Sequence, residues 1–267
     1  MARARKSLGQ NFLVEPHIQT RIVEAIHPTP TDTVVEIGPG KGALTKHLAG
    51  RVHALIAVEL DDLLAQQLQH VFKEYTGVTI VHMNALDFEP AQYVHDVEQL
   101  KIVGNIPYNI TSPLLFHLLE RRHRPHVLVV MVQKEVAIRI ATPPGSRDYG
   151  ALSIGIQSVA NVERLFNVAR GAFRPVPNVD SAVLRISPIR PYPMSEDDEI
   201  ALRTFTRAAF QRRRKQLQTI LRTAPEYALS PDATRAIGAE TGLDLERRPE
   251  TLSITELLLL TRALSHR

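Results

Sequence analysis

The sequence of 267 residues contains no cysteine. This absence excludes a disulfide framework, a thiolate metal site and a thiol nucleophile, and it suits a reducing compartment. The chain also lacks any run close to the roughly 18 continuous apolar residues of a membrane span, and its first residues lack the apolar stretch of a signal peptide. With 44% hydrophobic residues, it can bury one full core and a smaller second one. We therefore expect a globular, cytoplasmic protein without a membrane segment.

Acidic residues are scarce in one basic stretch of a sequence whose net charge is small. The net charge is +4 and the isoelectric point is about 9.5. The cations form a short arm near the N-terminus and a later cluster, namely Arg3, Arg5 and Lys6, then Arg203, Arg207, Arg212, Arg213, Arg214, Lys215 and Arg222. Clustered cations favour a polyanion partner, because each phosphate contact releases condensed counterions. The alternative for a single run of this kind is a solvated helix face.

Apolar runs and helical patterns alternate along the first part of the chain. Strands are expected at 33–37, 53–58, 78–82, 100–104 and 126–132, with helices at about 17–27, 43–50, 61–73, 112–121 and 133–141. This alternation predicts an α/β fold with a doubly wound, mostly parallel, Rossmann-like sheet. A helix at about 150–160 follows, and two strand-like runs at 162–169 and 181–187 are expected to pair as an antiparallel edge.

The pattern changes after Pro188. The segment IRPYPMSEDDE is typical of a linker, and the residues beyond it have a helical pattern to the end of the chain. We therefore predict an α/β domain at 1–190 and a small helical domain at 191–267.

A glycine-rich turn, EIGPGKG, directly follows one expected strand and precedes a helix. Gly38 and Gly40 let the backbone approach a ligand, and the amides of the helix N-terminus face the same place. Gly40 and Gly42 are one residue closer together than in a dinucleotide fingerprint, and Glu36 would repel a pyrophosphate. Glu59, at the end of the next strand, can accept hydrogens from both hydroxyls of a ribose. The motif favours S-adenosylmethionine over NAD, with an ordinary strand-turn-helix junction as the alternative.

The segment NIPY at 105–108 ends the fourth expected strand, where it would face the methyl group of that cofactor. The exocyclic amine of adenine is a poor nucleophile, because its lone pair is delocalised into the ring. The side-chain oxygen of Asn105 and a main-chain carbonyl near Ile106 can accept its two hydrogens and free that lone pair. Pro107 fixes the backbone, and Tyr108 offers a face on which the base can stack. A proline turn with a packing tyrosine is the structural alternative.

Two more residues are expected beside the bound groups. Asn84 follows the third strand, where its oxygen can accept from the adenine amine of the cofactor; it could equally start a turn. Phe173, in GAFRPVPNVDSAVLRI, is the candidate for a second ring on the target base, with a core position as the alternative. Asp180 and Ser181 are expected to set the turn into the next strand.

Taken together, these motifs resemble those of the small-subunit ribosomal RNA adenine N6,N6-dimethyltransferases (the KsgA or RsmA family). The similarity runs through nearly the whole chain, in the segments KSLGQNFL at 6–13, EIGPGKG at 36–42, VELD at 58–61, NIPY at 105–108, VQKEVAIR at 132–139, YGALSI at 149–154, FRPVPNVDSAV at 173–183, FQRRRKQLQTIL at 210–221 and RRPETLS at 247–253. So many ordered motifs are far more specific than any one of them.

The resemblance implies an S-adenosylmethionine-dependent methyltransferase that dimethylates two adjacent adenosines in a hairpin near the 3′ end of small-subunit rRNA. It implies cofactor contacts at Asn11, Leu13, Gly38, Gly40, Glu59, Asn84 and Asn105. It implies target-base contacts at Asn105, Tyr108 and Phe173, with Ile106 and Pro107 as the other catalytic residues of the NIPY segment. It also implies a basic helical domain that docks on rRNA, for which the candidate residues are Arg207, Arg212, Arg213, Arg214 and Lys215. We expect a monomer that acts on the small ribosomal subunit.

One position departs from the family pattern. The family usually has Asp where this chain has Asn84, so we expect weaker cofactor binding rather than lost activity. His117, His123 and His126 lack the spacing and the carboxylate neighbours of a metal site, so we interpret them as surface or turn residues and predict that no metal is bound.

Three other functions stay open. A large-subunit rRNA adenine methyltransferase of the resistance type shares the catalytic motifs, although FQRRRKQL and RRPETLS favour the small-subunit family. A non-catalytic RNA-binding relative is disfavoured by the intact NIPY and glycine turn. A dehydrogenase is disfavoured by the glycine spacing and by NIPY.

Overall fold

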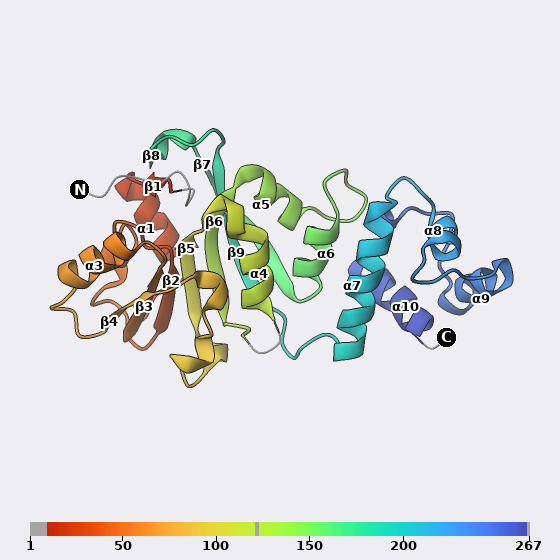
Figure 1. Cartoon of the computed structure of the whole chain (residues 1–267), viewed down its shortest axis with the longest axis horizontal. Helices are drawn as coiled ribbons and strands as arrows, with labels where there is room; N and C mark the ends of the chain where they lie inside the picture. The colour runs from red at the N-terminus through yellow and green to blue at the C-terminus, as the bar shows by residue number, and fades with distance from the viewer. Residues whose placement is uncertain (1–9, 121–122, 266–267) are drawn as a thin grey trace. The chain divides into compact units, whose positions relative to one another are not determined.

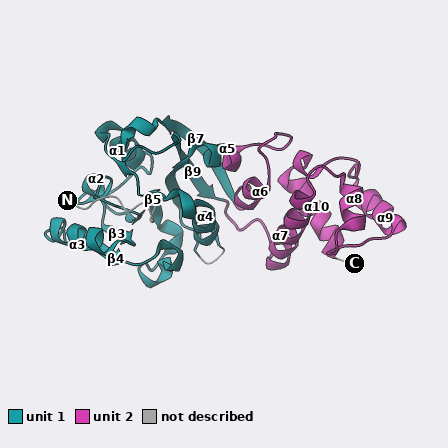
Figure 2. Ribbon diagram, turned by 45° about the horizontal axis from the view of Figure 1, so that its top comes forward, with its two compact units in different colours: residues 1–138, 160–188 teal, residues 139–159, 189–267 magenta. Residues whose placement is uncertain are grey.

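A computed structural model describes residues 10–120 and 123–265 (Figure 1). The basic arm formed by Arg3, Arg5 and Lys6 lies outside the described residues. The chain forms two compact units, Met1–Ile138 with Ala160–Pro188, and Arg139–Val159 with Ile189–Arg267 (Figure 2). No helix in the described part of the chain combines the length and the apolar character that crossing a membrane needs.

The first unit contains a seven-stranded sheet in the order β4-β3-β2-β5-β6-β9-β7. Its strands are β2 (Thr33–Ile37), β3 (Ala54–Glu59), β4 (Val78–His82), β5 (Lys101–Asn105), β6 (Val127–Gln133), β7 (Ala160–Val168) and β9 (Ser181–Pro188). The first five strands in this order, β4, β3, β2, β5 and β6, are parallel to one another. Strand β9 runs antiparallel to both of its neighbours, β6 and β7. The predicted Rossmann-like α/β fold with an antiparallel edge is therefore confirmed.

Helices precede, connect and follow the parallel strands, as in other doubly wound sheets. They are α1 (Pro16–Glu24), α2 (Thr45–Leu48), α3 (Asp62–Val71), α4 (Thr111–Leu119) and α5 (Lys134–Ala141). One core cluster joins Ile22 and Val23 of α1 with Val103, Val129 and Met131 of the central strands. Since β2 lies between β3 and β5, the strand order reverses there, and this reversal opens a crevice at the carboxyl ends of the strands.

A short second sheet was not predicted. It pairs β1 (Phe12–Leu13) with β8 (Phe173–Arg174) in antiparallel fashion. This pairing fastens the start of the described chain to the segment before β9, so that residues 10–13 lie next to the glycine turn.

The second unit is helical and contains α6 (Ala151–Gln157), α7 (Glu196–Gln211), α8 (Leu217–Thr223), α9 (Pro231–Thr241) and α10 (Ile254–Ser265). The segment 139–159, which the sequence assigned to the first domain, groups with these helices. Hydrogen bonds explain this grouping, because Gly145 N donates to Glu250 O (2.7 Å) and Arg213 Nη2 donates to Ser146 O (3.2 Å). The chain passes from the first unit to the second for the last time between residues 188 and 189. This boundary is close to the predicted domain boundary between residues 190 and 191.

Candidate active site

A cavity of about 360 Å³ lies at the carboxyl ends of β2, β3 and β5. It brings together most of the residues predicted from the sequence, namely Asn11, Leu13, Gly38, Gly40, Glu59, Asn105, Ile106, Pro107 and Tyr108. The cavity also takes in Gln10, Phe12, Glu36, Lys41 and Arg174, and all of its lining residues belong to the first unit.

The glycine turn forms the floor of this cavity in a conformation that requires glycine. Gly38, Gly40 and Gly42 have φ values of +65°, +59° and +79°, which residues with a side chain rarely adopt. A Cβ on Gly40 would also lie 3.1 Å from the ring of Phe12. The turn can therefore approach a ligand closely on one side while Phe12 covers the other.

The N-terminal segment is held against this turn by several contacts. The Lys41 ammonium lies 4.7 Å from the centre of the Phe12 ring, and Gln10 Nε2 donates to Asp61 Oδ2 (3.2 Å). The buried Gln19 donates to Leu13 O (2.9 Å). Sequence reasoning missed Gln10 and Phe12 because their positions depend on the pairing of β1 with β8, which leaves no local pattern.

Two buried carboxylates, Glu36 and Glu59, lie at the cavity without a basic partner among the described residues. Glu36 is 1% exposed and accepts from Thr45 Oγ1 (2.7 Å), and desolvation raises its pKa to about 7. Glu59 accepts from the main-chain N–H groups of Gly40 and Asp61, both at 2.9 Å, and burial raises its pKa as well. A cationic ligand would relieve the cost of burying these charges.

Asn105 ends β5 with its amide in a fixed orientation. Its Nδ2 donates to the main-chain oxygen of Asn11 (2.9 Å), so Oδ1 lies on the opposite side of the amide as an acceptor. Ile106 is 1% exposed, and its main-chain N–H donates to Met131 O (3.1 Å). Pro107 follows with φ −55°. The segment therefore presents a rigid backbone to the cavity.

Tyr108 is anchored by a residue that sequence reasoning assigned only to a turn. Its hydroxyl lies 2.8 Å from Ser181 Oγ, and Ser181 is fully buried at the start of β9. Burial raises the pKa of Tyr108, so the phenol stays neutral at ordinary pH. Asp180 Oδ1 accepts from Arg170 N (3.0 Å), ten positions earlier, and so links the residues that follow β7 to those that precede β9.

Two predicted residues do not line the cavity. The ring of Phe173 is fully buried in the core cluster with Leu13, which is the alternative that the sequence left open. Asn84 precedes the 3₁₀ turn η2 (Ala85–Asp87), and its Oδ1 accepts from Leu86 N (3.1 Å). Ligand contacts of these two side chains stay predictions.

The prediction that the histidines lack a carboxylate neighbour is wrong for two of them. His123 Nε2 lies 2.5 Å from Glu89 Oε2, and the ring of His117 packs edge-on against that of His123, with 4.6 Å between the ring centres. Glu89 is distant in sequence, which is why spacing alone did not reveal it. His126 is exposed.

The predicted RNA-binding cations gather around the end of α7 in the second unit. Arg207, Arg214 and Lys215 are exposed, and Arg212 and Arg213 are partly exposed. None of the five forms an ion pair with a carboxylate in the part of the chain that the structure describes. By contrast, Arg203 on the same helix pairs with Glu199 (2.5 Å). The acids of α7 lie in its first turn, away from this end.

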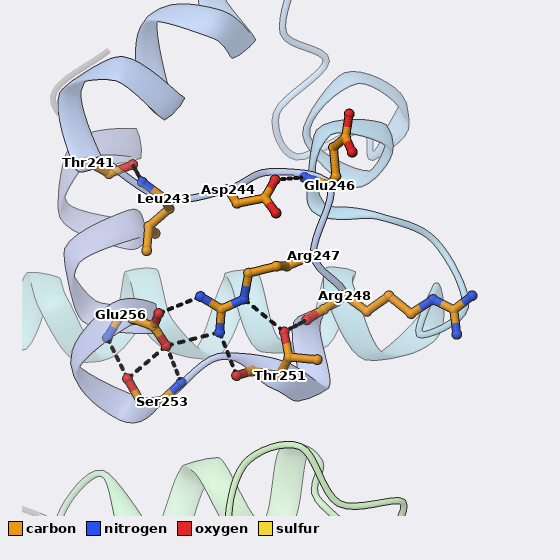
Figure 3. Close-up of polar contacts among 9 residues, drawn as sticks. All are labelled: Thr241, Leu243, Asp244, Glu246, Arg247, Arg248, Thr251, Ser253 and Glu256. Carbon is orange, nitrogen blue, oxygen red and sulfur yellow. Dashed lines mark hydrogen bonds and ion pairs between the residues drawn. The ribbon is translucent and has the colours of Figure 1, made fainter.

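The RRPETLS segment is held by a dense polar network (Figure 3). Arg247 donates to both carboxylate oxygens of Glu256 (2.5 and 3.3 Å) and to Thr251 O (2.7 Å). Glu256 also accepts from Ser253 N (2.8 Å), which caps the start of α10. The side chain of Arg248 points away from this network in Figure 3. Arg247 thus has a structural role, while Arg248 is exposed.

The sheet order, the glycine turn and the cavity at the carboxyl strand ends define a Rossmann-like methyltransferase. Residues 1–259 match the family described as ribosomal RNA adenine dimethylase, and the chain belongs to this family. It is 42% identical to ribosomal RNA small subunit methyltransferase A of Geobacter metallireducens over 98% of this chain and 96% of that protein. The protein of the same name from Aromatoleum aromaticum is also 42% identical to this chain, over 97% of this chain and 93% of that protein.

Solved structures show the same fold. A dimethyladenosine transferase from Plasmodium falciparum superposes with a TM-score of 0.79 at 24% identity, covering 93% of this chain and 95% of that one. The 23S rRNA methyltransferase ErmE superposes with a TM-score of 0.72 at 26% identity, covering 96% of this chain and 100% of that one.

Proposed function

We propose that the chain transfers methyl groups from S-adenosylmethionine to N6 of two adjacent adenosines in the 3′-terminal hairpin of small-subunit rRNA. The observation that carries this proposal is the fixed amide of Asn105, whose Oδ1 is kept as an acceptor at a cavity that also holds two buried carboxylates. An acceptor next to a site for a cation is what methylation of an amine requires.

The lining residues fit S-adenosylmethionine better than a dinucleotide. When bound, the cofactor supplies an electrophilic methyl group on a positively charged sulfur. Glu36 and Glu59 would each oppose a pyrophosphate, whereas they favour a cationic ligand with ribose hydroxyls. Gly38 and Gly40 let the backbone approach it, and residues 11–13 close the cavity over the turn.

The target adenine needs to be made nucleophilic and held in place. Asn105 Oδ1 accepts one hydrogen of its amine, and a main-chain carbonyl near Ile106 accepts the other, which directs the nitrogen lone pair away from the ring. Tyr108 stacks on the base, a contact worth roughly 1–3 kcal/mol, and Phe173 is the candidate for the second face. Because the methylated ammonium gives its proton to water, positioning and electrostatics carry the rate.

The small-subunit substrate is supported by the curated relatives, which carry that name at 42% identity over nearly their whole length. Similarity to ErmE supports the large-subunit alternative less strongly, at 26% identity. The five predicted RNA-binding cations, which form no ion pair with a carboxylate among the described residues, suit contacts with the rRNA backbone. We also propose that the chain acts as a monomer in the cytoplasm.

The substrate can be tested by incubating the purified chain with methyl-labelled cofactor and three acceptors. These are small subunits that lack the modification, large subunits, and naked rRNA. We expect label only in the small subunits. Label confined to the large subunits would support the alternative, and no transfer to any acceptor would contradict a methyltransferase function.

Asn105→Ala tests the chemistry on the small-subunit acceptor. Removing the amide acceptor should lower kcat by about 10²–10³-fold, as for the loss of a positioned polar group that stabilises developing charge. Calorimetry with the cofactor serves as the control for an intact site. A variant that binds cofactor and methylates at the parent rate would contradict this role of Asn105.

A further inference from the structure

A compact cluster of possible metal ligands, Glu89, His117 and His123, lies in the first unit away from the cavity described above. One nitrogen or carboxylate oxygen from each side chain lies within 4.8 Å of the others. Glu89 precedes the 3₁₀ turn η3 (Pro90–Gln92), His117 is near the end of α4, and His123 precedes β6. Three separate segments therefore meet at this point.

The hydrogen bonds of the two imidazoles fix which nitrogen carries a proton. His117 Nε2 lies 2.8 Å from Phe88 O, and His123 Nδ1 lies 2.8 Å from His117 O. A carbonyl oxygen can only accept, so both of these ring nitrogens are donors. A histidine that donates one ring N–H to a main-chain carbonyl offers its other nitrogen to a metal, and this second bond fixes the orientation of the ring.

The contact between His123 and Glu89 is the place in the cluster where a metal ion could replace a proton. His123 Nε2 lies 2.5 Å from Glu89 Oε2. At this distance the two atoms share a proton, and a bound metal ion would displace that proton and draw the two atoms apart. The side chain of His123 is 1% exposed whereas that of Glu89 is 31% exposed, and an ion can therefore enter from the carboxylate side.

We propose that Glu89, His117 and His123 bind one divalent transition-metal ion, of which zinc is the natural candidate. Two imidazoles and one carboxylate form a donor set that zinc accepts in four-coordinate sites, with water in the fourth position. Bonds of about 2.0–2.1 Å place tetrahedral ligand atoms roughly 3.3 Å apart. Ligand atoms that now lie within 4.8 Å of one another therefore need to move by at most about 1.5 Å to close the site.

Such an ion has a structural role, because it does not reach the cavity. It links the segment that follows Asn84 to the end of α4, the helix that begins just after the NIPY segment. An ion that binds the folded chain and not the unfolded one raises stability. The ion would hold the segment after Asn84 against α4 without taking part in the reaction.

Cobalt is the probe of choice, because tetrahedral Co²⁺ absorbs visible light. The full chain, made without a histidine tag and treated with a chelator, is titrated with Co²⁺ and then with Zn²⁺. We expect one equivalent of cobalt with a visible band that zinc abolishes, and a higher Tm with zinc. Glu89→Gln and His117→Gln should each weaken binding at least about tenfold, since even residues supporting a ligand contribute that much.

The matched control is His126→Gln, which removes an exposed histidine three positions from His123 and should leave metal binding unchanged. His123→Gln is not decisive, because this buried residue also supports the fold, whereas Glu89 is partly exposed. The proposal is overturned if the parent chain binds no stoichiometric metal, or if binding survives in both Glu89→Gln and His117→Gln. Methyl transfer by metal-free chain would leave the proposed function intact.

Discussion

Ser181 shows how a buried hydroxyl can act on a reaction through a second residue. It holds the Tyr108 hydroxyl at 2.8 Å and thereby limits rotation of the ring that we propose stacks on the base. Ser181→Ala removes a hydrogen bond worth about 0.5–1.5 kcal/mol, so we expect kcat/KM to fall by roughly 2- to 10-fold. Steady-state kinetics with small subunits measure this change, with cofactor affinity unaltered.

Tyr108→Phe supplies the matched comparison, since it removes the other partner of the same bond and keeps the ring. If the two residues act as a pair, the double variant loses no more than either single variant. Fully additive losses would mean that Ser181 does not act through Tyr108.

Glu36 should make cofactor binding depend on pH. Its carboxyl is neutral below a pKa of about 7 and charged above it, and only the charged form attracts a cationic ligand. Affinity should therefore rise with pH, by about tenfold between pH 6 and pH 8 if binding requires the ionised form. Calorimetric titration with S-adenosylmethionine across this range measures the effect.

Glu36→Gln is the control for this pH dependence, because the amide keeps the shape and cannot ionise. The variant should bind more weakly at pH 8 and show a flat profile from pH 6 to pH 8. A profile as steep as that of the parent would assign the dependence to another group, with Glu59 the first candidate, since burial raises its pKa too.

Asn84 is the position where the chain departs from the family pattern. Its Oδ1 already accepts from Leu86 N (3.1 Å), a turn bond that a carboxylate can also make. Asn84→Asp adds a charged acceptor, and a charge-assisted hydrogen bond is roughly twice as strong as a neutral one. We expect the cofactor dissociation constant to fall by about 3- to 10-fold in calorimetry, and an unchanged or higher value would contradict this role.

At the scale of the elements, the strands were predictable and the helix ends less so. The run TVVEI is buried on both faces of the sheet, so hydrophobicity alone locates β2, whose bounds match the prediction. The bounds of β4 also match, although this edge strand has no fully buried residue. The helix expected at 43–50 is only Thr45–Leu48, because Gly42 and Gly50 adopt positive φ at its two ends. The pairing of β1 with β8 could not be predicted, since two-residue strands carry no periodicity.

The start of α10 provides a test of element stability. The guanidinium of Arg247 lowers the pKa of Glu256 to about 2 from its ordinary 4.5. Because the folded-state value is the lower one, the stabilisation is fully present above pH 4.5 and is lost as the pH falls toward 2. These side chains are about 30% exposed, so after allowance for solvent screening we expect on the order of 1–2 kcal/mol.

Urea unfolding of Glu256→Gln and of the parent measures this contribution. The difference in unfolding free energy should be largest near pH 7 and should shrink near pH 3. The Asp198–Arg262 pair joins α7 to α10 through two hydrogen bonds of 2.8 Å. This pair is present in both the parent and the variant, so its own dependence on pH cancels in the difference between them. A difference that does not change with pH would assign the effect of the variant to packing.

At the scale of the whole molecule, the site is assembled from segments that lie far apart in the sequence. Motif spacing was enough to place Gly38, Glu59 and Asn105 together, because the carboxyl ends of neighbouring parallel strands meet at one edge. It could not show that Asn11 O orients the Asn105 amide across 94 positions, or that Glu89 faces His123 across 34. Contacts of this kind depend on the tertiary fold and leave no local signal.

Binding to rRNA should depend on salt through the cations near the end of α7. Each cation that neutralises a phosphate contributes about 0.7–0.9 to the slope of log K against log salt concentration. Replacing Arg207, Arg214 and Lys215 with glutamine should therefore reduce the magnitude of that slope by about 2–3. Binding of the chain to small subunits, measured over a range of KCl concentrations, gives the slope directly.

Arg203→Gln distinguishes a specific surface from a general effect of charge. Arg203 is exposed on the same helix, but it is already paired with Glu199, so it has little charge to offer a phosphate. Its replacement should leave the slope nearly unchanged. If Arg203→Gln lowers the slope as much as each of the other three changes, net charge rather than the end of α7 controls binding. In that case the cluster is the solvated helix face that the sequence also allowed.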